Sequence, residues 1–234
     1  ITNGVFQDSR GFIWSGTVGF GVNRLHITKN RTGLPPDSLV RTFTTADGLG
    51  SNSVVAIAES PKGTLWFGSV GGGLARRNTV TGQTSLLTKQ HGLSDNTVRA
   101  LATTPDGNVW VGTDDGGIHL FSNDRLLSKK KIPFRIHTLF PDHKGKLWIA
   151  SLGGGLSVLE NGKFRSYTPA NGFPDKLTFG IYEDHKRVLW IGTANAGLVA
   201  FKDGRFINIS TSNVLPDNRA YCILEDRHQN IWVS

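Results

Sequence analysis

The chain has 234 residues, 38% of them hydrophobic, and carries a formal net charge of +8 with a sequence isoelectric point near 9.8. No apolar run approaches the roughly twenty residues that a membrane-spanning helix needs, and a single cysteine excludes an intramolecular disulfide and a cysteine-rich metal site. The charge would suit nucleic acid, anionic lipid or an acidic polysaccharide. Because the basic residues are spread over the whole sequence, with one run at Lys129–Lys131, we interpret them as a solvated basic surface.

The first 15 residues predict two β-strands, and the second of them introduces a motif that the chain repeats. Each copy is a short apolar run around a tryptophan, too short for a helix and bounded by glycines, which is typical of a buried strand. The six tryptophans are spaced 52, 44, 38, 42 and 42 residues apart. They are Trp14, Trp66, Trp110, Trp148, Trp190 and Trp232. A fixed tryptophan at this period indicates a repeat protein.

Each repeat contains the signals for four strands. An apolar stretch that closes on an acidic residue, as at Ile181–Asp184, precedes the tryptophan run, and a glycine cluster such as Gly153–Gly155 follows it as a turn. A third apolar run then reaches a tight polar turn, Asn161-Gly162 or Asp203-Gly204, before a fourth run begins. Four strands at this period predict a β-propeller blade, with the tryptophans packed between blades.

The connections between repeats differ along the chain. The first repeat is overlong, and its excess around Asn30–Pro36 predicts an insertion in a surface loop. The loop Asp47–Asn52 is predicted to join one blade to the next. Its counterparts are His91–Asn96, Asn171–Lys176 and Asn213–Asn218. The repeat between Trp110 and Trp148 lacks this loop and carries Lys129–Lys131 instead, so we predict a short, differently shaped edge there.

The repeat count predicts part of a ring. Trp14 and Trp232 occupy the same position of the motif, so the chain holds five full repeats and half of a sixth. We therefore predict an all-β propeller of four-stranded blades in a single region, 1–234. Because both ends supply the same strands, we expect a portion of a propeller of six to eight blades or of a tandem pair, with exposed strand edges that promote association. The absence of methionine and of a signal peptide predicts a longer precursor.

The repeated pattern is acidic-x-x-Gly-x-Leu-Trp-Ile-Gly-Thr-x-Gly-Gly-Gly-Leu, followed by Asp-Gly-Leu and a Ser-Asn or Asp-Asn pair. It resembles the two-component regulator propeller repeat over the whole chain, with departures at Ala150, Arg187 and Ala194–Ala196. The resemblance implies the periplasmic sensor region of a membrane-spanning hybrid histidine kinase or related regulator. Such regions often comprise two seven-bladed propellers, followed by an immunoglobulin-like domain, a membrane helix and the signalling module. Any kinase, receiver or output domain would lie outside this region.

From this resemblance we expect a non-catalytic sensor that binds a small molecule or an oligosaccharide and passes a strain or dimerisation change to a signalling module. No cofactor, metal or nucleic acid is expected, membrane contact is expected only through a segment outside this region, and homodimerisation stays open. One alternative is an enzyme similar to streptogramin lyase, a propeller that uses a histidine and a divalent metal, for which His91 near Asp95 is the candidate. Another alternative is a protein-interaction scaffold.

The candidate ligand site lies where the loops of a propeller gather at the mouth of its central channel. Loops before the inner strands and turns after the second strands supply mixed amide, carboxylate and cationic side chains, which suit polyol hydroxyls. The candidate ligand-binding residues are Asn52, Asn96, Asp114, Asp115, Lys176, Asn195 and Arg219, with Ser51 and Asn218 beside them. We predict no catalytic residue, no metal-ligand spacing among the histidines, and a buried structural position for Cys222.

Overall fold

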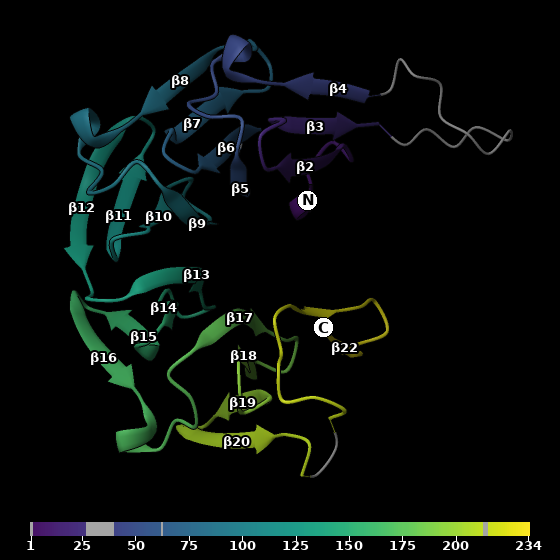
Figure 1. The fold of residues 1–234 in the computed structure, drawn as a ribbon, viewed down its shortest axis with the longest axis vertical. Coiled ribbons are helices and arrows are strands. Elements are labelled where there is room, and N and C mark those ends of the chain that lie inside the picture. The colour runs from purple at the N-terminus through teal and green to yellow at the C-terminus, as the bar shows by residue number, and fades with distance from the viewer. Residues whose placement is uncertain (1, 27–39, 62, 213–214) are drawn as a thin grey trace, which may run out of the picture. The chain divides into compact units, whose positions relative to one another are not determined.

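The computed structural model describes residues 2–26, 40–61, 63–212 and 215–234, so the predicted insertion at Asn30–Pro36 lies outside the described residues. The chain divides into two compact units, Ile1–Lys131 (unit 1) and Ile132–Ser234 (unit 2), which are taken separately below (Figure 1). Both consist of antiparallel sheets whose strands follow one another in sequence order. No helix in the described part of the chain is long and apolar enough to cross a membrane.

Unit 1 contains three four-stranded blades, numbered 1 to 3 in chain order (Figure 1). Blade 1 comprises β1 (Thr2–Gln7), β2 (Ile13–Thr17), β3 (Val22–Leu25) and β4 (Val40–Phe43). Blade 2 comprises β5 (Val54–Ser60), β6 (Thr64–Ser69), β7 (Gly73–Asn78) and β8 (Thr84–Leu87). Blade 3 comprises β9 (Val98–Thr103), β10 (Val109–Thr113), β11 (Gly117–Ser122) and β12 (Arg125–Lys131).

Unit 2 contains two four-stranded blades, 4 and 5, and a two-stranded sheet, the partial blade 6. Blade 4 comprises β13 (Arg135–Pro141), β14 (Leu147–Leu152), β15 (Gly155–Glu160) and β16 (Lys163–Tyr167). Blade 5 comprises β17 (Thr178–Glu183), β18 (Leu189–Thr193), β19 (Leu198–Lys202) and β20 (Arg205–Ile209). Blade 6 comprises β21 (Ile223–Glu225) and β22 (Ile231–Val233). Five full blades and a partial sixth confirm the predicted β-propeller architecture.

Trp14 and Trp148 pack against the neighbouring blade, as predicted. In unit 1, Trp14 of blade 1 lies with its ring centroid 5.6 Å from that of Phe67 in blade 2. In unit 2, Trp148 of blade 4 lies 5.2 Å from Phe201 of blade 5. Trp14, Trp66 and Trp148 are buried, whereas Trp232 in the two-stranded sheet is 59% exposed. A buried tryptophan of this kind contributes a large apolar area to the core, about 150–250 Å².

The strand positions explain the sequence pattern. The second and third strands of a blade are covered on both faces, so β6 and β14 are buried along almost their whole length. The outer strands are half exposed, and β12 alternates strictly between exposed and half-buried residues. Continuous apolar runs therefore mark the middle strands, while alternating or polar runs mark the edges.

The tight turns at the ends of the third strands have the predicted geometry. Asn161 and Gly162 both have positive φ, 50° and 76°, and so do Asp203 and Gly204, 50° and 79°. Two consecutive left-handed residues form the turn that matches the twist of a two-residue β-hairpin. Asparagine, aspartate and glycine are the residues that adopt this conformation at least cost.

The loops between blades contain a short turn that was not predicted. Three such turns are 3₁₀ helices: η2 (Thr45–Asp47), η3 (Lys89–His91) and η4 (Pro169–Asn171). Each is preceded by a threonine whose backbone N–H donates to the side chain of the last helical residue. In η2, Thr44 N–H donates to Asp47 at 3.0 Å, and in η4, Thr168 N–H donates to Asn171 Oδ1 at 2.7 Å. A left-handed glycine, such as Gly48, then ends the turn.

Two predictions are wrong: a short edge for blade 3 and a buried position for Cys222. The edge of blade 3 is not short, because Lys129–Lys131 extend β12 to seven residues, against four or five in the other outer strands. Without the inter-blade loop, the chain continues in extended conformation up to Ile132. Cys222 is exposed and not buried. It directly precedes β21, whose sheet has two strands, so fewer side chains cover it than cover the first strands of the complete blades.

Candidate functional site

The loops between blades and the turns after the second strands lie at one end of each blade, because successive strands of an antiparallel sheet reverse direction. We call this the loop end, and the opposite end, where the first strand turns into the second, the hairpin end. In unit 1, Gly21 N–H donates to Asn52 O at 2.7 Å, and Gly73 N–H donates to Asn96 O at 2.6 Å. Each turn is thus tied to the inter-blade loop that follows its blade. All seven predicted ligand residues lie at the loop end of their unit.

Asn52 and Asn96 have a structural role that the sequence did not reveal. Asn52 Oδ1 accepts from Thr45 N–H at 2.9 Å, and Asn96 Oδ1 accepts from Lys89 N–H at 2.8 Å. Each side-chain oxygen therefore holds the first residue of its 3₁₀ turn. The Nδ2 groups have no hydrogen-bond partner within the described part of the chain, and both residues are half-buried. The Nδ2 donors of Asn52 and Asn96 therefore remain available to a ligand, whereas their Oδ1 acceptors are occupied.

Asp115 is the centre of a polar cluster in blade 3. Its Oδ1 accepts from Ser94 Oγ at 2.8 Å and Thr113 Oγ1 at 2.7 Å, and its Oδ2 accepts from Lys131 Nζ at 2.8 Å. Burial raises the pKa of this carboxyl, but hydrogen bonds from Lys131 and the two hydroxyls outweigh it and hold the pKa well below its ordinary value. Asp115 is therefore ionised at neutral pH and fixed in position.

Asp114, the neighbouring carboxylate, forms an ion pair. Arg99 Nε donates to Asp114 Oδ1 at 2.8 Å, and the two side chains are 27% and 38% exposed. The backbone N–H of Asp114 donates to Thr97 O of the adjacent inner strand. This pair places a carboxylate and a guanidinium next to each other, both within reach of solvent, at the loop end of blade 3.

His119 is a buried polar residue that sequence reasoning did not single out. Ser94 N–H donates to His119 Nε2 at 3.0 Å, so the ring hydrogen lies on Nδ1, which faces Val111 O at 3.3 Å. Burial lowers the pKa of the imidazole, so His119 is neutral. Ser94, His119 and Asp115 are neighbours but do not form a nucleophilic triad, because Ser94 Oγ donates to the carboxylate and not to the imidazole. His119 lies in the continuously buried first half of β11, and no sequence pattern singled it out.

The three predicted residues of unit 2 form no comparable cluster. Asn195 N–H donates to Asp175 Oδ2 at 2.7 Å, and its side-chain amide donates to the same oxygen at 3.2 Å. Lys176 and Arg219 are exposed. The backbone carbonyl of Lys176 accepts from Gly155 N–H at 2.8 Å, so its backbone position is the counterpart of Asn96. At the loop end of unit 2 the structure therefore provides two exposed cations and a tethered amide.

Concave regions of unit 1 lie elsewhere. One of about 350 Å³ is lined by residues of the hairpin end in all three blades, among them Ser9, Glu59 and Thr103. Another of about 750 Å³ lies at the hairpin end of blade 3, with Asp106 and Asp124 in its wall. None of the predicted ligand residues lines either region.

At the hairpin end, an aspartate six residues before the tryptophan has a defined role in blades 1, 4, 5 and 6. Asp184 Oδ2 accepts from Trp190 Nε1 at 2.9 Å, and its Oδ1 accepts the backbone N–H groups of Lys186 and Val188. The same arrangement joins Asp8 to Trp14, Asp142 to Trp148 and Asp226 to Trp232. One carboxylate thus closes the turn and anchors the tryptophan six residues later.

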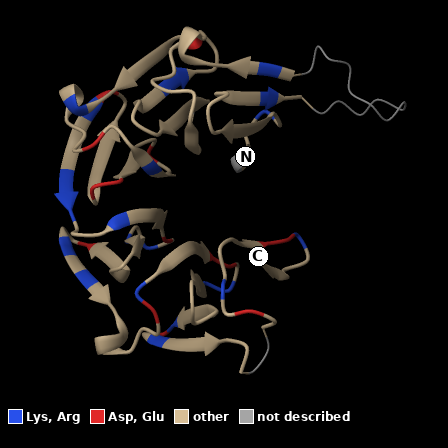
Figure 2. Cartoon of the chain, in the orientation of Figure 1, with Lys and Arg blue, Asp and Glu red and all other residues tan. Residues whose placement is uncertain are grey.

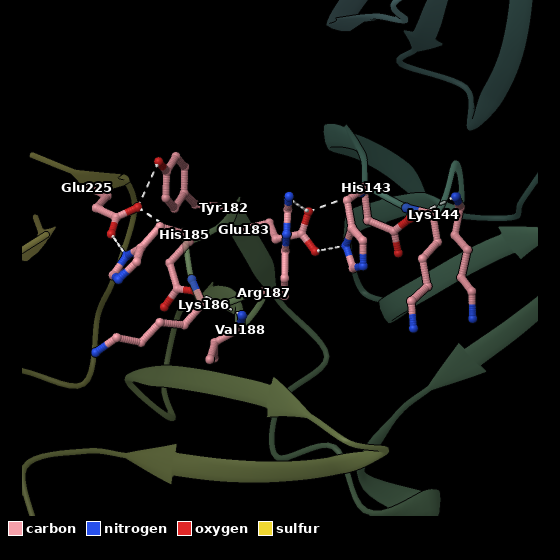
Figure 3. A network of polar contacts seen from close by, with 12 residues as sticks. His143, Lys144, Tyr182, Glu183, His185, Lys186, Arg187, Val188 and Glu225 are labelled. Carbon is pink, nitrogen blue, oxygen red and sulfur yellow. Dashed lines mark hydrogen bonds and ion pairs between the residues drawn. The ribbon is translucent and has the colours of Figure 1, made fainter. Parts of the chain in front are cut away.

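A second acidic position, one residue earlier, joins neighbouring blades (Figure 3). In unit 2, Glu183 of blade 5 accepts from the backbone N–H of His143 in blade 4 at 3.0 Å and contacts its Nδ1. Glu225 of blade 6 binds His185 of blade 5 in the same way. In unit 1, Glu59 accepts from Ser9 N–H at 2.7 Å and Ser9 Oγ at 2.8 Å. The sequence analysis did not distinguish these glutamates from the aspartates that bind the tryptophans. The adjacent pairs Glu183-Asp184 and Glu225-Asp226 are the sequence feature that distinguishes the two roles.

The anchoring aspartates predict acid sensitivity. Burial raises the pKa of Asp184, but the hydrogen bonds from Trp190, Val188 and Lys186 outweigh it and lower the pKa. A carboxyl with a lowered folded-state pKa stabilises the fold above its unfolded pKa of about 3.9 and loses that contribution as pH falls through the folded value. We expect Asp184→Asn to lower the free energy of unfolding at pH 7 by about 1–3 kcal/mol and to make its decline below pH 4 shallower. Urea unfolding across this pH range measures both.

The control for that prediction is Asp203→Asn, in an exposed turn where asparagine adopts the same left-handed conformation. It should leave both the free energy of unfolding and its pH dependence close to those of the parent chain. An equal decline with acid in the Asp184→Asn protein would contradict the role given to this carboxylate.

His91 and Asp95, the candidates of the enzyme alternative, each serve their own loop. His91 Nδ1 accepts from Thr88 N–H at 3.1 Å in the cap of η3, and Asp95 Oδ1 accepts from Thr97 N–H at 2.6 Å. Among the described residues, no three histidine, cysteine, aspartate or glutamate side chains are grouped as metal ligands.

With this geometry established, comparison with known proteins identifies the repeat. A family model described as two component regulator propeller matches residues 48–71, 92–115 and 214–234. The chain carries two component regulator propeller repeats. The first two matches each run from the glycine that ends a 3₁₀ turn to the turn after the second strand, so these propeller repeats contain the loop-end residues of unit 1. No curated protein matches the chain in sequence.

Solved structures show the same fold. The chain is similar over its whole length to the extracellular domains of two putative hybrid two component systems from B. thetaiotaomicron, with 21% and 19% identity and TM-scores of 0.58 and 0.67. It spans 37% of the length of each of these chains. It is also similar to a catalytically inactive virginiamycin B lyase from Staphylococcus aureus with quinupristin, at 14% identity and a TM-score of 0.77, covering 77% of that chain. At these identities the likeness shows the propeller fold alone.

Proposed function

We propose that this chain is the ligand-sensing propeller of a two-component signalling protein and that it binds an oligosaccharide at the loop end of unit 1. The observation that carries the proposal is the match of the two component regulator propeller model to the residues that build this end. The likeness to extracellular domains of putative hybrid two component systems supports an extracytoplasmic, periplasmic location.

The chemistry of the loop end of unit 1 suits a polyol. The Nδ2 groups of Asn52 and Asn96 are donors without a protein partner in the described chain, and the Arg99–Asp114 pair offers a cation and a carboxylate beside them. Val70, 37% exposed on the turn of blade 2, adds an apolar contact. Polar groups that converge beside apolar surface fix the orientation of a small ligand and select its hydroxyl pattern.

Signal transfer follows from differential binding. A ligand shifts an equilibrium between two conformations only if it binds one of them more tightly. Because the turns and inter-blade loops of unit 1 are hydrogen-bonded to one another, a ligand that contacts both changes the relation between neighbouring blades. In this proposal, a membrane-spanning segment outside this region carries that change to the signalling module.

The test is a binding screen of neutral and uronic-acid oligosaccharides by calorimetry, followed by Asn52→Asp and Asn96→Asp. Aspartate keeps the oxygen that accepts from the 3₁₀ turn but removes the amide donor, so the fold is preserved. Each substitution should weaken binding by about tenfold, which corresponds to the loss of one hydrogen bond.

Asn218→Asp is the matched control, because Asn218 Oδ1 caps Thr211 N–H in unit 2 in the same way at 2.8 Å. It should leave the affinity unchanged. Binding that is equally strong in all three variants would place the ligand elsewhere, and a screen in which no oligosaccharide binds would refute the proposed ligand class.

A further inference from the structure

The hairpin end of unit 2 differs in charge from the corresponding end of unit 1. At the first position of the turn between the first and second strands, unit 1 has Ser9, Pro61 and Pro105, followed in the sequence by Arg10, Lys62 and Asp106. Unit 2 has His143, His185 and Arg227 at the same position. The next residues of the unit 2 turns add Lys144, Lys186 and Arg187, and all of these side chains belong to exposed residues. Three neighbouring turns of one unit therefore present basic groups.

Arg187 occupies a backbone position that favours glycine. Its φ is 62°, and the corresponding residues of blades 1, 3 and 4 are Gly11, Gly107 and Gly145, also with positive φ. A side chain in this conformation carries a steric penalty that glycine avoids. The Arg187 side chain is 62% exposed, and its Nη1 lies 3.9 Å from Glu183 Oε2. Two of the turns in unit 2 thus carry a side chain at this position, Arg187 in blade 5 and Gln229 in blade 6, whose φ is 67°.

The turns of this end also contain the carboxylates Asp142, Glu183, Asp184, Glu225 and Asp226, and each accepts hydrogen bonds from its own or the preceding turn. Glu183 and Glu225 are 9% exposed and bind the histidines of the preceding turns, and Asp184 binds its own turn (Figure 3). Of the two exposed acidic residues at this end, Glu160 pairs with Lys146 at 3.1 Å, and Asp203 lies in an outer turn. The cations of these turns are thus more exposed than the glutamates, although basic residues occur in every blade (Figure 2).

The glutamates also fix the turns relative to each other. Each one binds both the backbone and the side chain of the first residue of the preceding turn, so the turns of blades 4, 5 and 6 are linked in series. The linked turns therefore follow one another from blade to blade along the hairpin end of unit 2. These turns contain no exposed phenylalanine, tyrosine or tryptophan that would stack on a sugar ring.

We propose that the hairpin end of unit 2 binds the surface of an anionic phospholipid bilayer. Its cations are Lys144, Lys186, Arg187 and Arg227. A flat array of phosphate groups matches a series of exposed basic turns, and each lysine or arginine close to such a surface strengthens binding about fivefold. The residues of this contact belong to the hairpin end of unit 2, whereas the proposed ligand residues belong to the loop end of unit 1.

The experiment measures cosedimentation of the chain with vesicles of phosphatidylcholine alone and of phosphatidylcholine mixed with phosphatidylglycerol. We expect binding to the anionic vesicles only, and release at high salt because the charges are solvent-exposed. The variant Lys144→Gln/Lys186→Gln/Arg187→Gly should bind on the order of 100-fold more weakly. Arg187→Gly introduces the glycine that blades 1 to 4 have at this position, so the variant should melt at the same temperature as the parent or higher.

The matched control is Lys176→Gln/Arg219→Gln, which removes two exposed cations from the loop end of the same unit. It should retain binding. Equal loss in both variants would show that overall charge and not this end is responsible, and would overturn the proposal. Failure of the parent chain to bind anionic vesicles at low salt would also overturn it. A third outcome would also overturn the proposal: the triple variant binds vesicles as the parent does but no longer binds inorganic polyphosphate. That result would identify a soluble polyanion as the ligand of these cations.

Discussion

Replacing Trp66 by alanine is expected to lower the free energy of unfolding by about 3–5 kcal/mol. The side chain is 1% exposed and belongs to the core of blades 2 and 3, together with Leu74, Val98 and Val111. Its Nε1 donates to Ser60 Oγ at 3.2 Å, so the substitution removes a hydrogen bond as well as the ring. The neighbouring strands are held by their own ladders and cannot collapse fully into the space. Urea or thermal unfolding measures the loss.

Two further substitutions test whether the loss of stability comes from burial of the indole ring or from its position in the motif. Trp232→Ala, at the equivalent site, should cost less than about 1 kcal/mol, because surface substitutions change stability little and this side chain is 59% exposed. Trp66→Phe should fall between the two, since it keeps most of the apolar area. If Trp66→Ala and Trp232→Ala destabilise the chain equally, burial between blades is not the source of the effect.

The second large effect is expected at Gly73, the first residue of β7, directly after the turn from β6. Its φ is +82°, and a Cβ at this position would lie 2.3 Å from Leu87 O. Its N–H also donates to Asn96 O at 2.6 Å, which ties blade 2 to the following loop. Gly73→Ala combines the left-handed penalty with displacement of the outer strand, and we expect a loss of about 3–4 kcal/mol.

Gly71 in the same turn provides the control. Its φ is +74°, but nothing lies within 4 Å of an added Cβ. Gly71→Ala should therefore cost only the conformational term, about 1–2 kcal/mol. The difference between the two variants, measured by chemical denaturation, reports the close approach of Gly73 to the outer strand. Equal losses would mean that the backbone conformation alone explains both.

Gly71 and Gly73 also show which property of a glycine turn the sequence does not predict. A run of three glycines predicts a turn, because glycine accepts positive φ without steric cost. It does not distinguish a glycine required by φ from one required by a neighbouring backbone. That distinction depends on Leu87, which is fourteen residues away along the chain and reaches the turn only when the sheet is formed.

The same distinction applies to the candidate site: the repeat predicts where its residues lie but not which groups they contact. The repeat predicted that Asn52, Asn96 and Asp115 would lie at the loop end, because strand order alone decides which end a loop occupies. It did not predict that the amide oxygens of Asn52 and Asn96 hold the 3₁₀ turns, nor that Lys131 binds Asp115. Lys131 was interpreted as part of a basic run at a shortened edge, and the extension of β12 brings it to the carboxylate.

The sequence by itself determined the blade: its four strands, the two-residue turns at Asn161 and Asp203, and the number of repeats. These features depend on φ preferences and on the alternation of apolar residues, which act over a few neighbouring residues. Only the tertiary structure decided which polar groups meet, such as Glu183 with His143 and Ser94 with His119. Those partners are 40 and 25 residues apart, and a hydrogen bond needs placement to within a few tenths of an ångström. Packing of one strand or blade on the next supplies that placement, and no local pattern encodes it.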